Sequence, residues 1–302
     1  MLFHGLSAVD VSSCAALAAV QGLTVALPRG GRASVRLRWL WLAPPVLFSA
    51  AVLVLALQPR SAGVVSAIAF VAVPALALLA AVRLARGSRP AWALVVPVLL
   101  VASLAGPQRL SGQLGITLLC ALSAVALGAM LVRLGGVRGV VLGLVALAAA
   151  DVALVADGSV GAAANALTQG RLGELPELSH VALGTFTLGY GDLFVAGVAG
   201  AIASRRPGGQ LRVAALTTAL MLLESAFLAG KGPYPATVPV VVALVADEVA
   251  WWLRTRRPPA AEAAAPAPAR PSLAAVPDPP AAPAAPVPPS GDDAAAHSRM
   301  AA

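Results

Sequence analysis

Long apolar runs separated by short arginine-bearing loops constrain the fold of this 302-residue chain more than any other feature. Hydrophobic residues make up 59% of the sequence and charged residues only 11%, a balance too apolar for a water-soluble globular domain. A helix needs about 20 apolar residues to cross a bilayer, and only helices and closed barrels satisfy their own backbone there. We therefore predict an all-α polytopic membrane protein.

Nine stretches come close to the length that a membrane-spanning helix requires. The first contains Asp10 and Gln21 among its polar residues, and the fourth is short and contains Pro97. The nine predicted transmembrane helices cover residues 6–27, 40–57, 64–82, 91–105, 114–132, 137–156, 181–203, 213–229 and 236–253.

The basic residues predict how these helices are oriented. Fifteen arginines follow the odd-numbered spans, whereas the other loops hold only Arg60, Arg109, Arg171 and Lys231. Because basic residues of short loops stay on the cytoplasmic side, we expect the N-terminus outside and the C-terminus inside a cell membrane. Arginines confined to such loops do not form the continuous basic face of a nucleic-acid-binding protein.

The chain ends in a segment rich in proline and alanine. Residues 258–302 lack the apolar residues needed for a core, so we expect a disordered cytoplasmic tail. Cys14 and Cys120 lie in apolar segments without the spacing of metal ligands, and the sequence implies no metal and no organic cofactor.

Two aspartates interrupt neighbouring apolar segments. Asp151 lies in the predicted sixth span and Asp192 in the seventh. An ionisable group at that depth costs roughly 3 kcal/mol on insertion scales, and for that reason it usually marks a functional site. Two carboxyls at close range share one proton, because like charges disfavour ionisation of both. One group then accepts a proton from water while the other donates one, which is the chemistry of an aspartyl protease.

The sequence around the second aspartate gives a more specific indication. Gly189, Tyr190, Gly191 and Asp192 lie within LGYGDLF, which resembles the Gly-x-Gly-Asp signature of the presenilin and signal peptide peptidase family of intramembrane aspartyl proteases. In that family the signature lies in the seventh of nine spans and the partner aspartate in the sixth. The positions of Asp151 and Asp192 are similar.

A second motif strengthens the resemblance. The family has a Pro-Ala-Leu motif at the start of the ninth span, where this chain has Pro235, Ala236 and Thr237. The family usually has tyrosine directly before the first aspartate, where this chain has Ala150. The predicted orientation is similar to that of the signal peptide peptidase branch.

The resemblance implies a presenilin-like bundle that cleaves transmembrane peptides or proteins within the lipid bilayer. It divides the chain into a five-helix region over residues 1–136, a catalytic four-helix region over 137–257 and the tail. Asp151 and Asp192 would be catalytic. The residues expected to shape the site and hold the substrate are Gly189, Tyr190, Gly191, Pro235, Ala236 and Thr237. Nothing in the sequence indicates an oligomeric state.

The depth of the two aspartates conflicts with continuous helices. Asp151 lies five residues before the predicted outer end of the sixth span, whereas Asp192 lies eleven residues into the seventh. The mismatch is about 9 Å at 1.5 Å per residue. An extension of the sixth helix through Gly158 to Asn165 would largely remove it.

Three other interpretations remain open. A proton-coupled transporter would use both carboxyls as a relay. A potassium-channel pore would use TFTLGYGDL as its filter, although the apolar residues that follow leave no room for the usual extracellular turn. A prepilin-type peptidase shares the Gly-x-Gly-Asp motif but usually has a lysine shortly after the aspartate and fewer spans.

Overall fold

The computed structural model describes eight α-helices and one β-hairpin. The residues that it describes are 8–28, 62–85, 87–106, 108–159, 175–183, 186–228 and 235–256, with the single residues Val46, Ala50, Val54 and Asn165. Met1–Arg256 form one compact unit. The predicted tail lies outside the described residues, and the predicted boundary at residue 136 stays a prediction.

Most of the described residues are helical. The helices are α1 (Ala8–Ala26), α3 (Ala62–Leu79, continued by the π-helical turn Ala80–Leu84), α4 (Val95–Ala105, preceded by the 3-10 turn Pro90–Leu94), α5 (Leu110–Gly135), α6 (Val137–Ala156), α8 (Tyr190–Ala203), α9 (Gly209–Leu228) and α10 (Thr237–Arg256). Pro97 is the third residue of α4, where a missing backbone N–H is tolerated.

These helices correspond to eight of the nine predicted spans. The predicted second span, 40–57, lies almost entirely outside the described residues. Three helices are long and apolar enough to cross a membrane, namely Ala62–Leu84, Leu110–Gly135 and Val137–Ala156. Large apolar side chains such as Val71 and Leu94 are more than two-thirds exposed, which suits contact with lipid. The chain therefore has the features of a multi-pass membrane protein.

The prediction of a continuous seventh helix was wrong. Strands β1 (His180–Leu183) and β2 (Phe186–Gly189) form an antiparallel hairpin, and α8 begins only at Tyr190. Val181 and Leu188 face each other across the hairpin and are both buried. Threonine, phenylalanine and valine in this segment favour strands, and its glycines disfavour a helix. The fold is therefore mostly helical rather than all-α.

Helix α8 lies at the centre of the packing because glycines let other backbones approach it. A Cβ atom on Gly197 would lie 2.3 Å from the Ala124 carbonyl oxygen of α5, and one on Gly200 would lie 2.1 Å from the Val25 carbonyl oxygen of α1. A side chain at either glycine would force the helices apart. These two glycines therefore serve helix packing.

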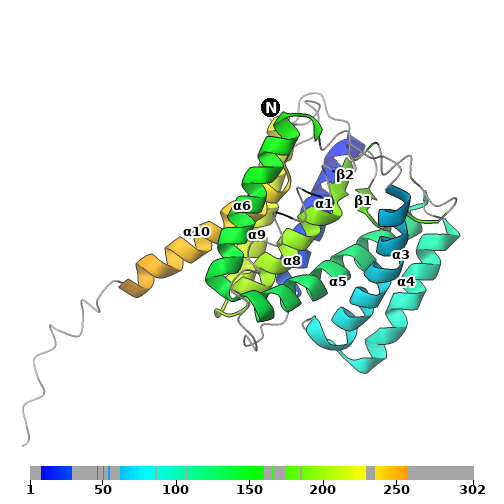
Figure 1. Cartoon of the computed structure of the whole chain (residues 1–302), viewed down its shortest axis with the longest axis horizontal. Helices are drawn as coiled ribbons and strands as arrows, with labels where there is room; N and C mark the ends of the chain where they lie inside the picture. Colours follow the sequence, from blue (N-terminus) through cyan, green and yellow to red (C-terminus); the bar gives the residue numbers. More distant parts are fainter. Residues whose placement is uncertain are drawn as a thin grey trace, which may run out of the picture. The chain divides into compact units, whose positions relative to one another are not determined.

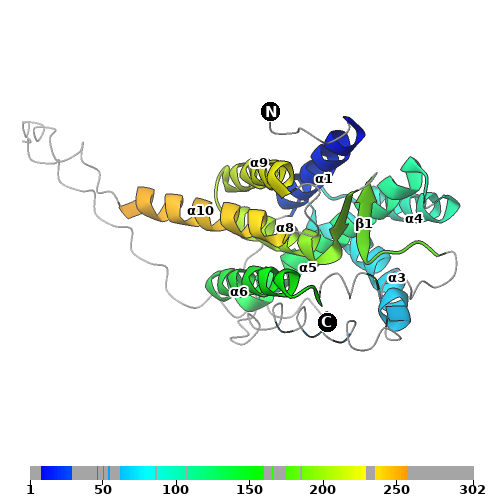
Figure 2. The same cartoon turned by 90° about the horizontal axis from the view of Figure 1, so that it is seen from above.

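The remaining helices flank this centre. Figure 1 shows α3 and α4 beside α5, whereas α6 and α10 lie on the other flank of α8. In Figure 2, α9 lies next to α1, and these two helices make one of the most extensive contacts in the chain. The β-hairpin contacts both α1 and α5. The hairpin is thus packed against helices on part of its surface.

The C-terminal ends of several helices, in regions of the chain that carry arginine, lie together at one end of the unit. Arg205 Nη2, after α8, donates to the carbonyl oxygen of Val132 at the end of α5, over 3.4 Å. Pro28 after α1 forms a bridge with Ala85 after α3. The C-terminal ends of α1, α3, α5 and α8 thus lie together. This arrangement agrees with the alternation of basic loops in the sequence.

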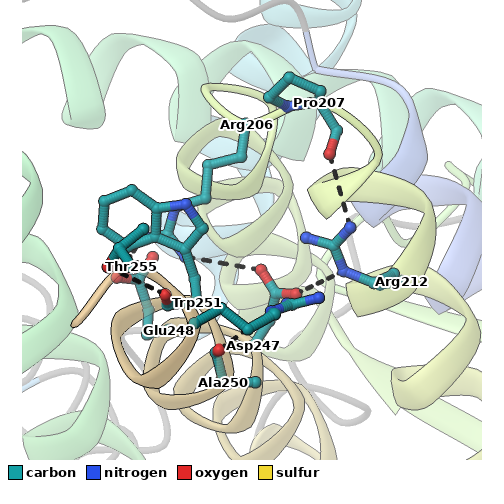
Figure 3. A network of polar contacts seen from close by, with 9 residues as sticks. Arg206, Pro207, Arg212, Asp247, Glu248, Ala250, Trp251 and Thr255 are labelled. Atoms are coloured by element: carbon teal, nitrogen blue, oxygen red, sulfur yellow. Dashed lines mark hydrogen bonds and ion pairs between the residues drawn. The ribbon is translucent and has the colours of Figure 1, made fainter. Parts of the chain in front are cut away.

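A cluster of ion pairs at this end holds the C-terminal half of α10 in place (Figure 3). Arg212 Nε donates to Asp247 Oδ1 at 2.8 Å, and Arg206 Nη1 lies 3.6 Å from Asp247 Oδ2. Arg206 also pairs with Glu248 and stacks over the Trp251 ring, with its Cζ atom 4.3 Å from the ring centroid. Asp247 is 7% exposed, so α10 is tied to the α8–α9 turn by a buried carboxylate.

Candidate active site

Asp151 lies in the penultimate turn of α6 and is buried at 5% exposure. Its Oδ2 accepts a hydrogen bond of 2.6 Å from the Thr237 hydroxyl. The backbone N–H of Thr237 is directed at the same carboxyl group. Thr237 is the first residue of α10, so the carboxyl lies at a helix N-terminus, where unpaired N–H groups and the helix dipole favour negative charge.

Asp192 also lies at a helix N-terminus, in this case that of its own helix, α8. It is the third residue of that helix, and its Oδ2 accepts a 2.9 Å hydrogen bond from the backbone N–H of Gly189, the residue that caps the helix. An acidic side chain that bonds back to the cap residue stabilises a helix start. Asp192 is half-buried, with one carboxyl oxygen engaged in this bond.

The two carboxyls lie close enough for their charges to interact. They come from α6 and α8, and no hydrogen bond between them is found among the described residues. Glu224 of α9 is a third acidic group whose charge interacts with both aspartates. Its Oε2 atom is buried and has no hydrogen-bond partner among the described residues. The site therefore contains three carboxyls in an apolar bundle.

Asp151 and Asp192 lie at a similar depth in the bundle. Asp151 is 13 residues along α6 from Arg138, and Asp192 is 11 residues from the C-terminal end of α8. At 1.5 Å per residue both are about 16 to 20 Å from the arginine-rich end, near the middle of a hydrocarbon core of about 30 Å. The expected mismatch is absent because the hairpin delays the start of α8. Helix α6 ends at Ala156 and Gly158 has a φ of +80°, so α6 does not continue through Gly158, and most of the suggested extension to Asn165 lies outside the described residues.

Gly189 and Gly191 lie at a strand-to-helix junction rather than inside the predicted seventh helix. They were expected to shape the site, and they lie where β2 changes into α8. A Cβ atom on Gly189 would lie 3.1 Å from Asp192 Oδ2. The absence of a side chain at Gly189 therefore leaves room for the carboxyl.

The Tyr190 hydroxyl forms its hydrogen bond with a residue of α5 and not with either carboxyl. This hydroxyl lies 2.8 Å from Ser123 Oγ, and Ser123 already donates its own proton to the Cys120 carbonyl oxygen. Tyr190 is therefore the donor to Ser123. Its role in the described structure is to fix the strand-to-helix junction beside Asp192.

The Pro235–Thr237 segment meets the site through its last residue. Thr237 contacts Asp151, Ala236 is 5% exposed, and the Ala236 carbonyl oxygen accepts a 3.0 Å hydrogen bond from Gln21 Nε2 of α1. The structure thus brings Asp151, Asp192 and Thr237 together from three helices. Sequence analysis placed Thr237 among the residues expected to hold the substrate, without a contact to Asp151, and gave Gln21 no role.

The described residues contain no group of three or more histidine, cysteine, aspartate or glutamate side chains arranged to hold a metal ion. Comparisons of the chain with protein-family models, with curated proteins and with solved structures returned no match. The arrangement of the site is therefore the basis for a functional assignment.

Proposed function

We propose that this chain is an intramembrane aspartyl endopeptidase that hydrolyses peptide bonds within transmembrane helices, with Asp151 and Asp192 as the catalytic pair. The observation that carries the proposal is the interaction of two carboxyls from α6 and α8 in an apolar bundle. Each carboxyl also lies at a helix N-terminus, which stabilises the ionised form that one member of the pair must adopt.

The reaction needs one proton shared between the two groups. The ionised carboxyl accepts a proton from water, and the water oxygen forms a bond to the peptide carbonyl carbon. The protonated carboxyl donates its proton to the leaving nitrogen as the carbon–nitrogen bond breaks. Because the two groups titrate as a pair, either aspartate can supply the base.

A substrate helix must unwind before its peptide bonds can react, and the neighbouring backbone supports this step. Strand β2 pairs with β1 along one edge and with no other described strand along the second. It ends at Gly189, three residues before Asp192. An extended peptide placed along a free strand edge forms main-chain hydrogen bonds with it. Pro235, which cannot donate a backbone hydrogen bond, lies two residues before Thr237, which contacts Asp151.

Cleavage of transmembrane peptides by the purified protein in detergent tests this proposal. We expect cleavage by the wild type and none by Asp151→Asn or Asp192→Asn, because an amide keeps the capping oxygen but cannot exchange the proton. Asp157→Asn is the matched control. Asp157 lies just beyond α6, is exposed, and hydrogen bonds from Ser159 hold its pKa below the usual value. Cleavage that survives either substitution in the pair would contradict the mechanism.

Glu224 favours one second candidate, a proton-coupled transporter. Three carboxyls in electrostatic contact resemble the relay of acidic groups that moves protons through a membrane. Proton uptake into liposomes that requires Glu224 as well as both aspartates, without peptide cleavage, would favour transport. The potassium-channel interpretation gains no support, because Tyr190 and Gly191 lie in the first turn of a helix rather than in an extended filter.

A further inference from the structure

Gln21 is an amide buried in an apolar part of the bundle. It lies in the second half of α1 and is 0% exposed. Its Nε2 donates to the Ala236 carbonyl oxygen over 3.0 Å, a contact between residues 215 positions apart in the chain. Of the two polar atoms of the Gln21 amide only the nitrogen can donate to a carbonyl oxygen, so the amide orientation is fixed with Nε2 toward Ala236.

The oxygen atom of this amide indicates that packing alone does not explain why residue 21 is a glutamine. Gln21 Oε1 is buried and has no hydrogen-bond partner among the described residues. An apolar side chain of similar size would fill the same space without leaving an acceptor unpaired. The hydrogen bond to Ala236 is therefore the feature that distinguishes glutamine from methionine or leucine at this position.

The Ala236 carbonyl belongs to the same peptide group as the Thr237 N–H. A peptide group is planar and trans, so its C=O and N–H point in opposite directions. Gln21 binds the oxygen end of this group, and the N–H end is directed at Asp151. Fixing one end fixes the direction of the other. Hydrogen bonds in such a chain also polarise one another.

The first turn of α10 also carries a proline. Pro239 is the third residue of α10 and has no N–H, which a first turn tolerates, and the Pro235 carbonyl accepts from Val238 N at 3.0 Å. Gln21 adds a contact to this turn from another helix. The hydroxyl of Thr237 then donates to Asp151 at 2.6 Å.

We infer that Gln21 is a positioning residue for Asp151. It orients and polarises the peptide group between Ala236 and Thr237, so that both donors of Thr237 remain aimed at the carboxyl. Helix α1, which sequence motifs leave outside the catalytic region, thereby completes the site. The inference rests on the proposed proteolytic function for its kinetic consequence but not for its structural one.

Gln21→Met tests the inference, because methionine keeps the length and burial of the side chain but donates no hydrogen bond. We expect kcat for a transmembrane peptide to fall about tenfold while KM changes less than about twofold, since Asp151 is misdirected but the substrate contacts remain. Gln21→Leu provides a second variant should methionine reduce the folded yield.

Gln210→Met is the matched control. Gln210 is also a buried glutamine with an unpaired Oε1, and its Nε2 also contacts α1, donating to the carbonyl oxygens of Val25 and Pro28. Its side chain forms no hydrogen bond with α10 or Asp151 among the described residues. We expect it to lower thermal stability at least as much as Gln21→Met while leaving kcat near the wild-type value.

The carboxyl carbon of Asp151 gives a readout that does not need cleavage. In protein labelled with ¹³C-aspartate, the Asp151 resonance is identified by its loss in Asp151→Asn. We expect Gln21→Met to shift it in the same direction as Thr237→Val, and Gln210→Met to leave it in place. An unchanged resonance in both Gln21 variants would overturn the inference even if the wild type cleaves peptide. Absence of Asp-dependent cleavage would instead contradict the proposed function.

Discussion

The Thr237 hydroxyl donates a 2.6 Å hydrogen bond to Asp151, joining the start of α10 to the penultimate turn of α6. The family motif that this segment resembles has leucine in place of Thr237, and leucine cannot form this bond. Both side chains are almost fully buried. The threonine therefore gives this chain a direct contact between its Pro-Ala-Thr segment and one proposed catalytic carboxyl.

Removal of this hydroxyl tests its importance. We expect Thr237→Val, which keeps the shape, to lower kcat/KM about tenfold, consistent with about 1.5 kcal/mol for a hydrogen bond to a charged group. Thr237→Ser keeps the donor and should retain activity within about threefold. Steady-state kinetics on one transmembrane peptide measures both. Equal losses in the two variants would show that the hydroxyl is not the relevant feature.

Gly189→Ala should impair activity more than stability. The backbone φ of Gly189 is −66°, which alanine adopts freely, but the new Cβ atom would lie 3.1 Å from Asp192 Oδ2. We expect the carboxyl to shift and the cleavage rate to fall, while the unfolding midpoint in detergent stays within a few degrees of wild type. A variant with full activity would show that Asp192 tolerates this displacement.

Gly197→Ala should instead impair stability more than it impairs the chemistry of the site. Its Cβ atom would lie 2.3 Å from the Ala124 carbonyl oxygen, a backbone atom that cannot rotate away. We expect α5 and α8 to separate, at a cost of about 1 to 3 kcal/mol in the free energy of unfolding. Thermal unfolding in detergent measures this loss. An unchanged midpoint would mean that the two helices are not in contact at Gly197.

Asp247→Asn should destabilise the protein from the other end of α10. The buried carboxylate pairs with Arg206 and Arg212 (Figure 3), and its neutralisation leaves both cations without this partner. We expect a loss of about 3 kcal/mol in unfolding free energy, and a smaller loss for Glu248→Gln, whose side chain is more exposed. Equal and small effects of the two variants would argue against a structural role for the cluster.

The length of the apolar runs predicted most helices, because a helix needs about 20 apolar residues to cross a bilayer. It missed the β-hairpin since the apolar segment from Val181 continues into the following helix, and an apolar run does not by itself distinguish strand from helix. The sequence contained a usable signal in the Gly, Thr and Phe residues of VALGTFTLG. With the hairpin in place, the depths of Asp151 and Asp192 agree without any extension of α6.

The candidate site was accessible from sequence only in part. The aspartates could be found because a charged group in an apolar run is costly wherever it lies. The role of Gln21 could not be found, because it depends on which helices pack together, and a single uncharged polar residue in a span has many structural explanations. Thr237 needed the geometry of α6 and α10 before its hydroxyl acquired a partner.

The rate of peptide cleavage in single-aspartate variants tests the central claim most directly. With purified protein and one transmembrane peptide, we predict that Asp151→Asn and Asp192→Asn each lower kcat by more than about a thousandfold, whereas Asp157→Asn stays near wild type. Parallel unfolding curves ensure that all three variants are folded. Substantial cleavage by either Asp151→Asn or Asp192→Asn would contradict a shared-proton mechanism.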